Sequence, residues 1–90
     1  MAEAHVVVRG LVQRVYFRGS VQEEAQTRGL TGWVRNNPDG SVEAVLQGPR
    51  PAVQHVVEWM RRGPPGARVD SVELAWSGVQ EPMRSFDIVR

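Results

Sequence analysis

The 90-residue sequence contains no cysteine and no lysine, and it has no long apolar run. The absence of cysteine excludes disulfides and thiolate metal sites. The two histidines, His5 and His55, are far apart and lack the spacing of metal ligands, so we expect no metal and no cofactor. No segment approaches the roughly 20 apolar residues of a membrane span, and no signal peptide is visible. We therefore expect a cytoplasmic protein that has no contact with a membrane.

The charges are almost balanced, with 11 basic and 10 acidic residues and a formal net charge of +1. Such a weak overall field does not indicate nucleic acid or an anionic membrane as a partner. The composition, 41% hydrophobic and 23% charged, is ordinary for a globular protein. We expect one domain over residues 1–90, acting as a monomer. All basic residues are arginine, whose planar donors suit phosphate and carboxylate groups.

Several segments alternate between apolar and polar residues, which is typical of strands. The first runs over residues 5–12, with Val6, Val8 and Val12 as the expected inner face. Residues 31–36 and 41–47 should form an antiparallel hairpin, because the Asn-Pro-Asp-Gly sequence between them favours a tight turn. Alternation returns in residues 69–76 and again near the end of the chain, at Phe86 and Ile88.

Two segments have the periodicity of helices. From about Phe17 to Arg28, apolar residues recur every four positions, and Gly29 is a natural stop. A capping box formed by Ser20 and Glu23 would start this helix later, but the earlier start places Phe17 on the buried stripe. A second helix should begin near Pro51, a residue favoured in the first turn. Its core stripe consists of Val53, Val56, Val57 and Met60.

The expected order is strand, helix, strand, strand, helix, strand, followed by a short closing strand. Two helices must then cover one face of an antiparallel sheet of four to five strands. This is the α+β arrangement of the ferredoxin-like βαββαβ sandwich. The fold hosts many unrelated activities, so the function must be argued from specific residues.

The first segment of chemical interest runs from Gly10 to Arg18, where a strand enters a loop that opens a helix. In this geometry the backbone N–H groups and the positive end of the helix dipole converge, which favours an anion. Arg18 lies in the first helical turn, where the dipole disfavours a cation by about 0.3–1 kcal/mol. A bound phosphate would reverse that effect, because Arg18 and the amides would bind it together. The alternative is a solvated arginine that is tolerated at small cost.

The second segment runs from Gly32 to Gly40, and Asn36 ends its strand just before the tight turn. Considered alone, Asn36 is explained as a turn former. Arg35 should be a surface charge on the opposite face of the strand, and Trp33 a packing residue. His5 and His55 have no obvious partner, and we expect His55 to be partly buried, so neither is assigned as a general base.

Taken together, the two segments resemble the signatures of the acylphosphatase family. The first signature, G-x-V-Q-G-V-x-F-R, corresponds here to residues 10–18, with Arg14 in place of its second glycine. The second, G-W-V-[KR]-N-x-x-x-G-x-V-x(5)-G, corresponds to residues 32–48. The order and separation of the two also agree, and the resemblance spans almost the whole chain.

The resemblance implies an enzyme that hydrolyses the carboxyl–phosphate bond of a small acyl phosphate, without metal, cofactor or covalent intermediate. Arg18 would bind the phosphoryl group, and Asn36 would hold the attacking water. The loop amides would share the phosphoryl group with Arg18; they belong to Gln13, Arg14, Val15, Tyr16 and Phe17. Such a reaction depends on positioning and charge stabilisation, and a carboxylate is a good leaving group. The sequence does not indicate which acyl phosphate is the physiological substrate.

Arg14 is the main departure from the family pattern. If this position needs a positive φ, a residue other than glycine costs roughly 1–2 kcal/mol. We expect Arg14 to weaken the rigidity of the loop rather than to abolish activity. Two other readings stay open: a non-catalytic phosphate- or anion-binding regulatory domain, and an RNA-binding module. The sequence lacks the aromatic RNP1-like run of RNA-binding sheets, which argues against the last.

Overall fold

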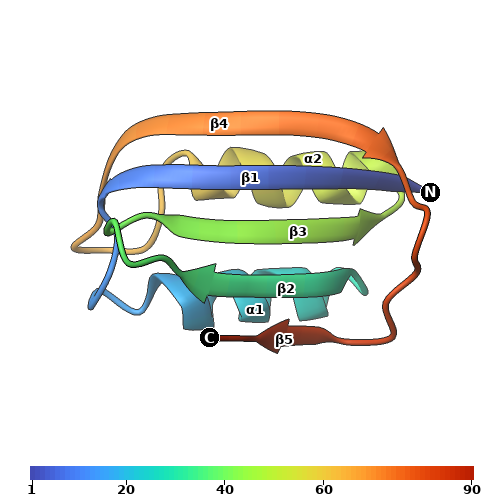
Figure 1. Ribbon diagram of the computed structural model, residues 1–90, viewed down its shortest axis with the longest axis horizontal. Coiled ribbons are helices and arrows are strands. Elements are labelled where there is room, and N and C mark those ends of the chain that lie inside the picture. Colours follow the sequence, from blue (N-terminus) through green and yellow to red (C-terminus); the bar gives the residue numbers. More distant parts are fainter.

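A computed structural model describes all 90 residues, and Figure 1 shows a sheet with two helices packed on one side. The strands are β1 (Ala2–Leu11), β2 (Thr31–Asn36), β3 (Val42–Gly48), β4 (Arg68–Gly78) and β5 (Phe86–Ile88). The helices are α1 (Phe17–Thr27) and α2 (Arg50–Met60). This order and the two-layer arrangement confirm the expected ferredoxin-like α+β fold.

The strands lie in the order β4-β1-β3-β2-β5. The pairs β1–β3, β1–β4 and β2–β3 are antiparallel, as expected. The short β5 pairs in parallel with β2, with Phe86 opposite Gly32. The sheet is therefore mixed, and the expectation of a wholly antiparallel sheet was wrong in its last pair. The direction follows from the path of the chain, because residues 79–85 return along the end of the sheet and bring β5 to the start of β2 (Figure 1).

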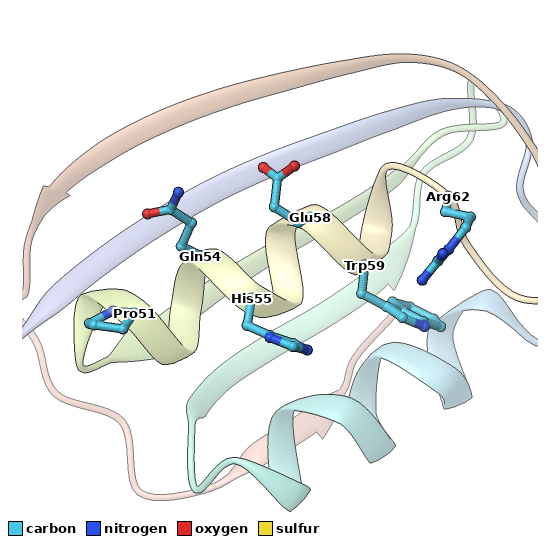
Figure 2. Close-up of a pocket in the computed structure, with 6 residues that line it drawn as sticks. All are labelled: Pro51, Gln54, His55, Glu58, Trp59 and Arg62. Atoms are coloured by element: carbon cyan, nitrogen blue, oxygen red, sulfur yellow. The ribbon is translucent and has the colours of Figure 1, made fainter.

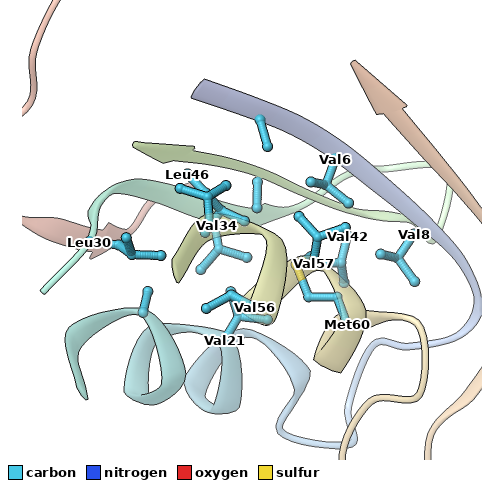
Figure 3. Close-up of a cluster of buried hydrophobic side chains, with 14 of the residues drawn as sticks. Val6, Val8, Val21, Leu30, Val34, Val42, Leu46, Val56, Val57 and Met60 are labelled. Carbon is cyan, nitrogen blue, oxygen red and sulfur yellow. The ribbon is translucent and has the colours of Figure 1, made fainter. Parts of the chain in front are cut away.

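The hydrophobic core lies between the sheet and the helices (Figure 3). Because side chains alternate along a strand, every second residue faces the helices, and Val6 and Val8 are fully buried as expected. Val12 is also buried, although β1 ends one residue before it. The stripe predicted for the second helix is confirmed: its four members are all buried.

Helix α1 begins at Phe17, so the later start suggested by the Ser20–Glu23 capping box was wrong. Packing decides the outcome, because the Phe17 ring lies 6.0 Å from that of Trp59 in α2 and only 1% of Phe17 is exposed. Burying a phenylalanine contributes roughly 1.5–3 kcal/mol, which exceeds the roughly 1 kcal/mol of a typical cap. The aromatic contact fixes the start of α1 against the end of α2.

The face of the sheet away from the helices carries a polar network. His5 is hydrogen-bonded to Glu43 at 2.5 Å, and Glu43 also accepts two hydrogen bonds from Arg35. The expectation that His5 has no partner was therefore wrong. The guanidinium of Arg35 also lies 5.1 Å from the centre of the Trp33 ring. His55 lies on the outside of α2 and is exposed, so its expected partial burial was also wrong.

Candidate active site

A pocket of about 220 Å³ lies where β1 and β2 end and α1 begins. Its lining brings the two candidate segments together, since Arg14 and Arg18 come from the first and Asn36 from the second. The remaining lining residues are Val12, Tyr16, Phe17, Gly19, Gln22 and Ile88. Segments that are separate in the sequence thus enclose one cavity.

The loop between β1 and α1 has an unusual backbone. Arg14 and Tyr16 both adopt left-handed conformations, with φ of 65° and 61°. Residues other than glycine seldom occupy this region, and such conformations cluster at functional sites. The position where Arg14 replaces the glycine of the family signature therefore does adopt a positive φ.

The backbone amides of this loop are free. None of the backbone hydrogen bonds outside the helices and strands is donated by a residue between Gln13 and Gly19. Helix α1 has Tyr16 at its N-cap, where no side chain caps the first amides, and its first turn contains no acidic residue. Uncapped amides and the positive end of the dipole therefore meet beside the pocket, an arrangement that favours an anion.

Arg18 occupies the first turn of α1, lines the pocket and is partly buried. It takes part in none of the seven ion pairs of the protein. A cation at this end of a helix is disfavoured by the dipole, so nothing in the protein itself explains its position. An anion in the pocket would satisfy both the guanidinium and the free amides.

Asn36 is the last residue of β2 and pairs with Val42 across the hairpin. Alternation along β2 places it on the same face as the buried Val34, while Arg35 faces the other side. The prediction that Arg35 and Asn36 lie on opposite faces of this strand is therefore confirmed. The side-chain amide of Asn36 makes no hydrogen bond with the protein, so its donor and acceptor are both available to the pocket.

Gln13 fixes the loop to the neighbouring hairpin. Its side-chain amide donates to the carbonyl of Asn37 at 2.8 Å and to that of Ser41 at 3.0 Å. Both carbonyls belong to the turn that follows Asn36. One side chain therefore joins the loop that carries the free amides to the turn that follows Asn36.

The turn is braced from within by Asp39, Ser41 and Asn37. Asp39 accepts hydrogen bonds from the hydroxyl and the backbone N–H of Ser41, at 2.6 and 2.9 Å, and a third from Arg9. These bonds, those of Ser41 first, lower the pKa of Asp39 to about 2 from the usual 3.8. Asn37 in turn donates to the Ser41 hydroxyl.

Arg35 connects this turn to the network on the open face of the sheet. It donates from Nε to Oδ1 of Asn37 at 3.1 Å, and from Nη2 to Glu43 at 2.9 Å. The pKa of Glu43 is lowered, first by its hydrogen bond with His5 and then by that from Arg35, against the opposing effect of burial. These hydrogen bonds stabilise the ionised form of Glu43 beside Arg35, the residue that precedes Asn36 in β2.

The pocket has a strongly positive character. Two guanidinium groups, those of Arg14 and Arg18, line it, and no carboxylate, histidine or cysteine does. Nor does any group of three or more such side chains elsewhere in the protein form a cluster that could hold a metal ion. An oxyanion is the ligand that these donors can bind, and Asn36 can orient a water or a carbonyl beside it.

The predicted site residues fall into two groups. Arg14, Tyr16, Phe17, Arg18 and Asn36 line the pocket, whereas Gln13 and Val15 do not. The side chain of Gln13 is directed into the neighbouring turn, and Val15 packs against the core. Of these two residues, only the backbone amides are available to the site.

Several lining residues of the pocket were not predicted from the sequence, among them Gln22 and Ile88. Gln22 lies four residues after Arg18, one helical turn further along, and this spacing could have identified it. Ile88 reaches the pocket only through the parallel pairing of β5 with β2, which no local pattern signals.

A second and larger cavity, of about 700 Å³, lies on the outside of α2 (Figure 2). His55 and Trp59 are directed from α2 toward α1, while Gln54 and Glu58 lie on the other side of the helix (Figure 2). It shares no residue with the pocket of Arg18 and Asn36. The residues of α2 that line this cavity also offer no free backbone amide, because they lie within a helix that continues to Met60.

The fold and the pocket together define a ferredoxin-like α+β protein with a positively charged pocket at the start of its first helix. The sequence model of the acylphosphatase family matches residues 4–88. An acylphosphatase from Pyrobaculum aerophilum is 53% identical over 90 residues, which is 99% of this chain and 95% of the relative. The crystal structure of acylphosphatase from Bacillus subtilis superposes with a TM-score of 0.96 at 40% identity, covering all of both chains. That of Coxiella burnetii gives 0.92, also at 40% identity, and covers 98% of this chain and 92% of the other.

The chain therefore belongs to the acylphosphatase family, whose members are hydrolases. Neither of its two helices, each of 11 residues, has the length and apolar character needed to cross a membrane.

Proposed function

We propose that this protein hydrolyses small acyl phosphates to a carboxylate and inorganic phosphate, by direct attack of water on the phosphorus atom. The observation that supports this most strongly is the meeting of Arg18, the free loop amides and Asn36 at one pocket. The first two bind charge and the third can hold a water, which are the two requirements of phosphoryl transfer to water.

In this mechanism the phosphoryl group of the substrate lies against the amides of residues 13–17. The guanidinium of Arg18 donates to its oxygens and stabilises the charge that spreads over them in the transition state. These donors are fixed before the substrate arrives, because the start of α1 is anchored by Phe17 and the loop is anchored by Gln13. Preorganised donors need little rearrangement during the reaction, which is the main source of their effect.

Asn36 orients the nucleophile. The side-chain carbonyl can accept a hydrogen bond from the water, and the water oxygen is then directed at phosphorus, opposite the leaving carboxylate. The bond from water oxygen to phosphorus forms as the bond from phosphorus to the carboxyl oxygen breaks, and the carboxylate leaves with the electron pair. Both protons of the water end on the phosphate, giving H₂PO₄⁻. The substrate phosphate thus accepts the transferred proton, and no side chain is required as a base.

The test is the hydrolysis of benzoyl phosphate, in excess EDTA, by the wild type, Arg18→Gln and Asn36→Ala. Each variant should lose on the order of 10²-fold or more in kcat, the effect of removing one preorganised donor. Arg84→Gln is a matched control, because Arg84 is exposed, has no ion pair and lies near the opposite end of β2. Circular dichroism establishes that each variant is folded.

A folded wild type without activity would contradict the proposal. The alternative, a non-catalytic phosphate-binding regulatory domain, would then explain the same pocket, and phosphate binding that depends on Arg18 would support it. The cytoplasmic location and monomeric state expected from the sequence stay predictions.

A further inference from the structure

Arg14 is the one charged lining residue of the pocket that the proposed mechanism uses only through its backbone. Its guanidinium makes no hydrogen bond or ion pair with the protein. By contrast, Arg9 and Arg35 are both held by carboxylates, and Arg50 lies 4.2 Å from the centre of the Trp76 ring. Arg14 is thus a free cation at the site itself.

The position of Arg14 is unfavourable for the protein alone. Its backbone has a φ of 65°, a conformation that disfavours every residue with a β-carbon. It also lines the same pocket of about 220 Å³ as Arg18, and no carboxylate is among the lining residues to pair with either guanidinium. Neither the fold nor the local electrostatics of the protein explains an arginine here. A bound group with more than one negative centre would.

The pocket also offers such a ligand two distinct regions, one partly buried and one exposed. Arg18 is partly buried at the start of α1, beside the free amides, whereas Arg14 is exposed. Apolar side chains also line the pocket, and Tyr16 and Ile88 are 67% and 41% exposed. A phosphoryl group held at the inner end would direct its acyl chain past these apolar surfaces toward solvent. Arg14 is the cation available to a charged group at the far end of that chain.

We propose that Arg14 forms a second anion subsite, which selects acyl phosphates whose acyl group carries another anionic group, such as a carboxylate. This inference rests on the proposed function only for the identity of the phosphoryl group. Arg14 is then a specificity-determining residue: it binds the substrate but takes no part in the bond exchange. The attraction acts between exposed charges, so it should weaken as the salt concentration rises.

The test compares two ligands that share a phosphonate head and differ in one carboxylate, propylphosphonate and 3-phosphonopropionate. Their dissociation constants are measured by calorimetry at low salt. The wild type should bind the carboxylate-bearing ligand about five- to tenfold more tightly, the effect of one charge-assisted contact in a partly exposed site. Arg14→Gln should abolish this preference, Arg14→Lys should retain most of it, and Arg84→Gln should leave it unchanged.

A kinetic comparison separates this proposal from the proposed function. The ratio of kcat/KM for monosuccinyl phosphate to that for acetyl phosphate should fall by a similar factor in Arg14→Gln and keep its wild-type value in Arg84→Gln. Normal hydrolysis with a ratio that Arg14→Gln does not change would overturn the subsite alone. An Arg14-dependent binding preference without hydrolysis of either substrate would support the subsite and overturn the enzymatic reaction. Equal binding of the two phosphonates by the wild type would also overturn the subsite.

Discussion

The side chain of Gln13 donates a 2.8 Å hydrogen bond to the backbone carbonyl of Asn37, and so joins the β1–α1 loop to the β2–β3 turn. The same amide nitrogen donates to Ser41 in that turn. The loop carries the phosphate donors of the proposed mechanism and the turn follows the residue that holds the water. This side chain is therefore a direct link between the two halves of the site, in addition to the pairing of β1 and β2 with β3.

Replacing Gln13 with leucine should reduce both stability and catalysis. The carbonyls of Asn37 and Ser41 each lose one of two donors, since each also accepts a backbone N–H, so the free energy of unfolding should fall by about 0.5–1.5 kcal/mol for each hydrogen bond lost. If Gln13 sets the position of the turn relative to the loop, kcat should fall more than the affinity for inorganic phosphate, because the phosphate donors stay within the loop. Denaturant titration, benzoyl phosphate kinetics and phosphate calorimetry measure these effects.

Gln54→Leu is the control for this substitution, since Gln54 is exposed on α2 and makes no hydrogen bond. A Gln13→Leu protein that loses stability but keeps its kcat would show that the tether serves only the fold.

Arg14→Gly should stabilise the protein. Relief of the left-handed conformation gains about 1–2 kcal/mol, and the greater freedom of glycine in the unfolded chain offsets about 0.5–1 kcal/mol of this. We therefore expect a net gain of about 0–1.5 kcal/mol in the free energy of unfolding, centred on about 0.75 kcal/mol and measured by urea titration. Arg14→Ala removes the same guanidinium but keeps the strain, so it should be less stable than Arg14→Gly. Equal stabilities of the glycine and alanine variants would contradict the strain argument.

Acid should destabilise the protein partly through Asp39. The pKa of Asp39 is about 2 in the folded protein against 3.8 without its partners, so the unfolded chain binds this proton at the higher pH. The stability that Asp39 contributes is therefore complete above about pH 4 and is lost as the pH falls toward 2. In Asp39→Asn the free energy of unfolding should depend less steeply on pH in this window.

Urea titrations between pH 2 and 5 measure the effect of Asp39. Asp70→Asn removes an equivalent carboxylate from the exposed Arg68–Asp70 pair on β4, and so corrects for the change in net charge. The prediction fails if Asp39→Asn follows the wild-type slope. Glu43, whose pKa is also lowered, remains in both variants and contributes a residual slope of the same sign.

The sequence predicts most of the fold because its local signals agree with one another. The alternation in residues 31–36 and the Asn-Pro-Asp-Gly turn fixed β2 to the residue, ending at Asn36. The spacing of apolar residues gave the stripe of α2, since that helix has only one apolar face to bury. Arg18 and Asn36 were selected by a motif, and the structure brings them to one pocket, although their catalytic roles stay predictions.

What the sequence did not reveal depends on contacts between distant segments. The partner of His5 is Glu43, 38 residues away, and it is found only when the register of β1 on β3 is known. A three-residue strand carries no signal of its direction, so the parallel pairing of β5 was unpredictable, and with it the place of Ile88 in the pocket. The acceptors of Gln13 are backbone carbonyls, which no residue type identifies.

The strand order β4-β1-β3-β2-β5 has a further consequence for how the molecule comes to be formed. The inner strand β1 pairs with β3 and β4, with Ala2 opposite Gly48 and Gly78, so large loops must close before either contact is made. Chains dominated by such distant pairings fold slowly, because the entropy of closure is lost before the contacts compensate for it. The helices can form rapidly and locally. The pocket forms only after the slow alignment of β1, β3 and β2, because that alignment brings the loop of Arg18 beside the strand end of Asn36.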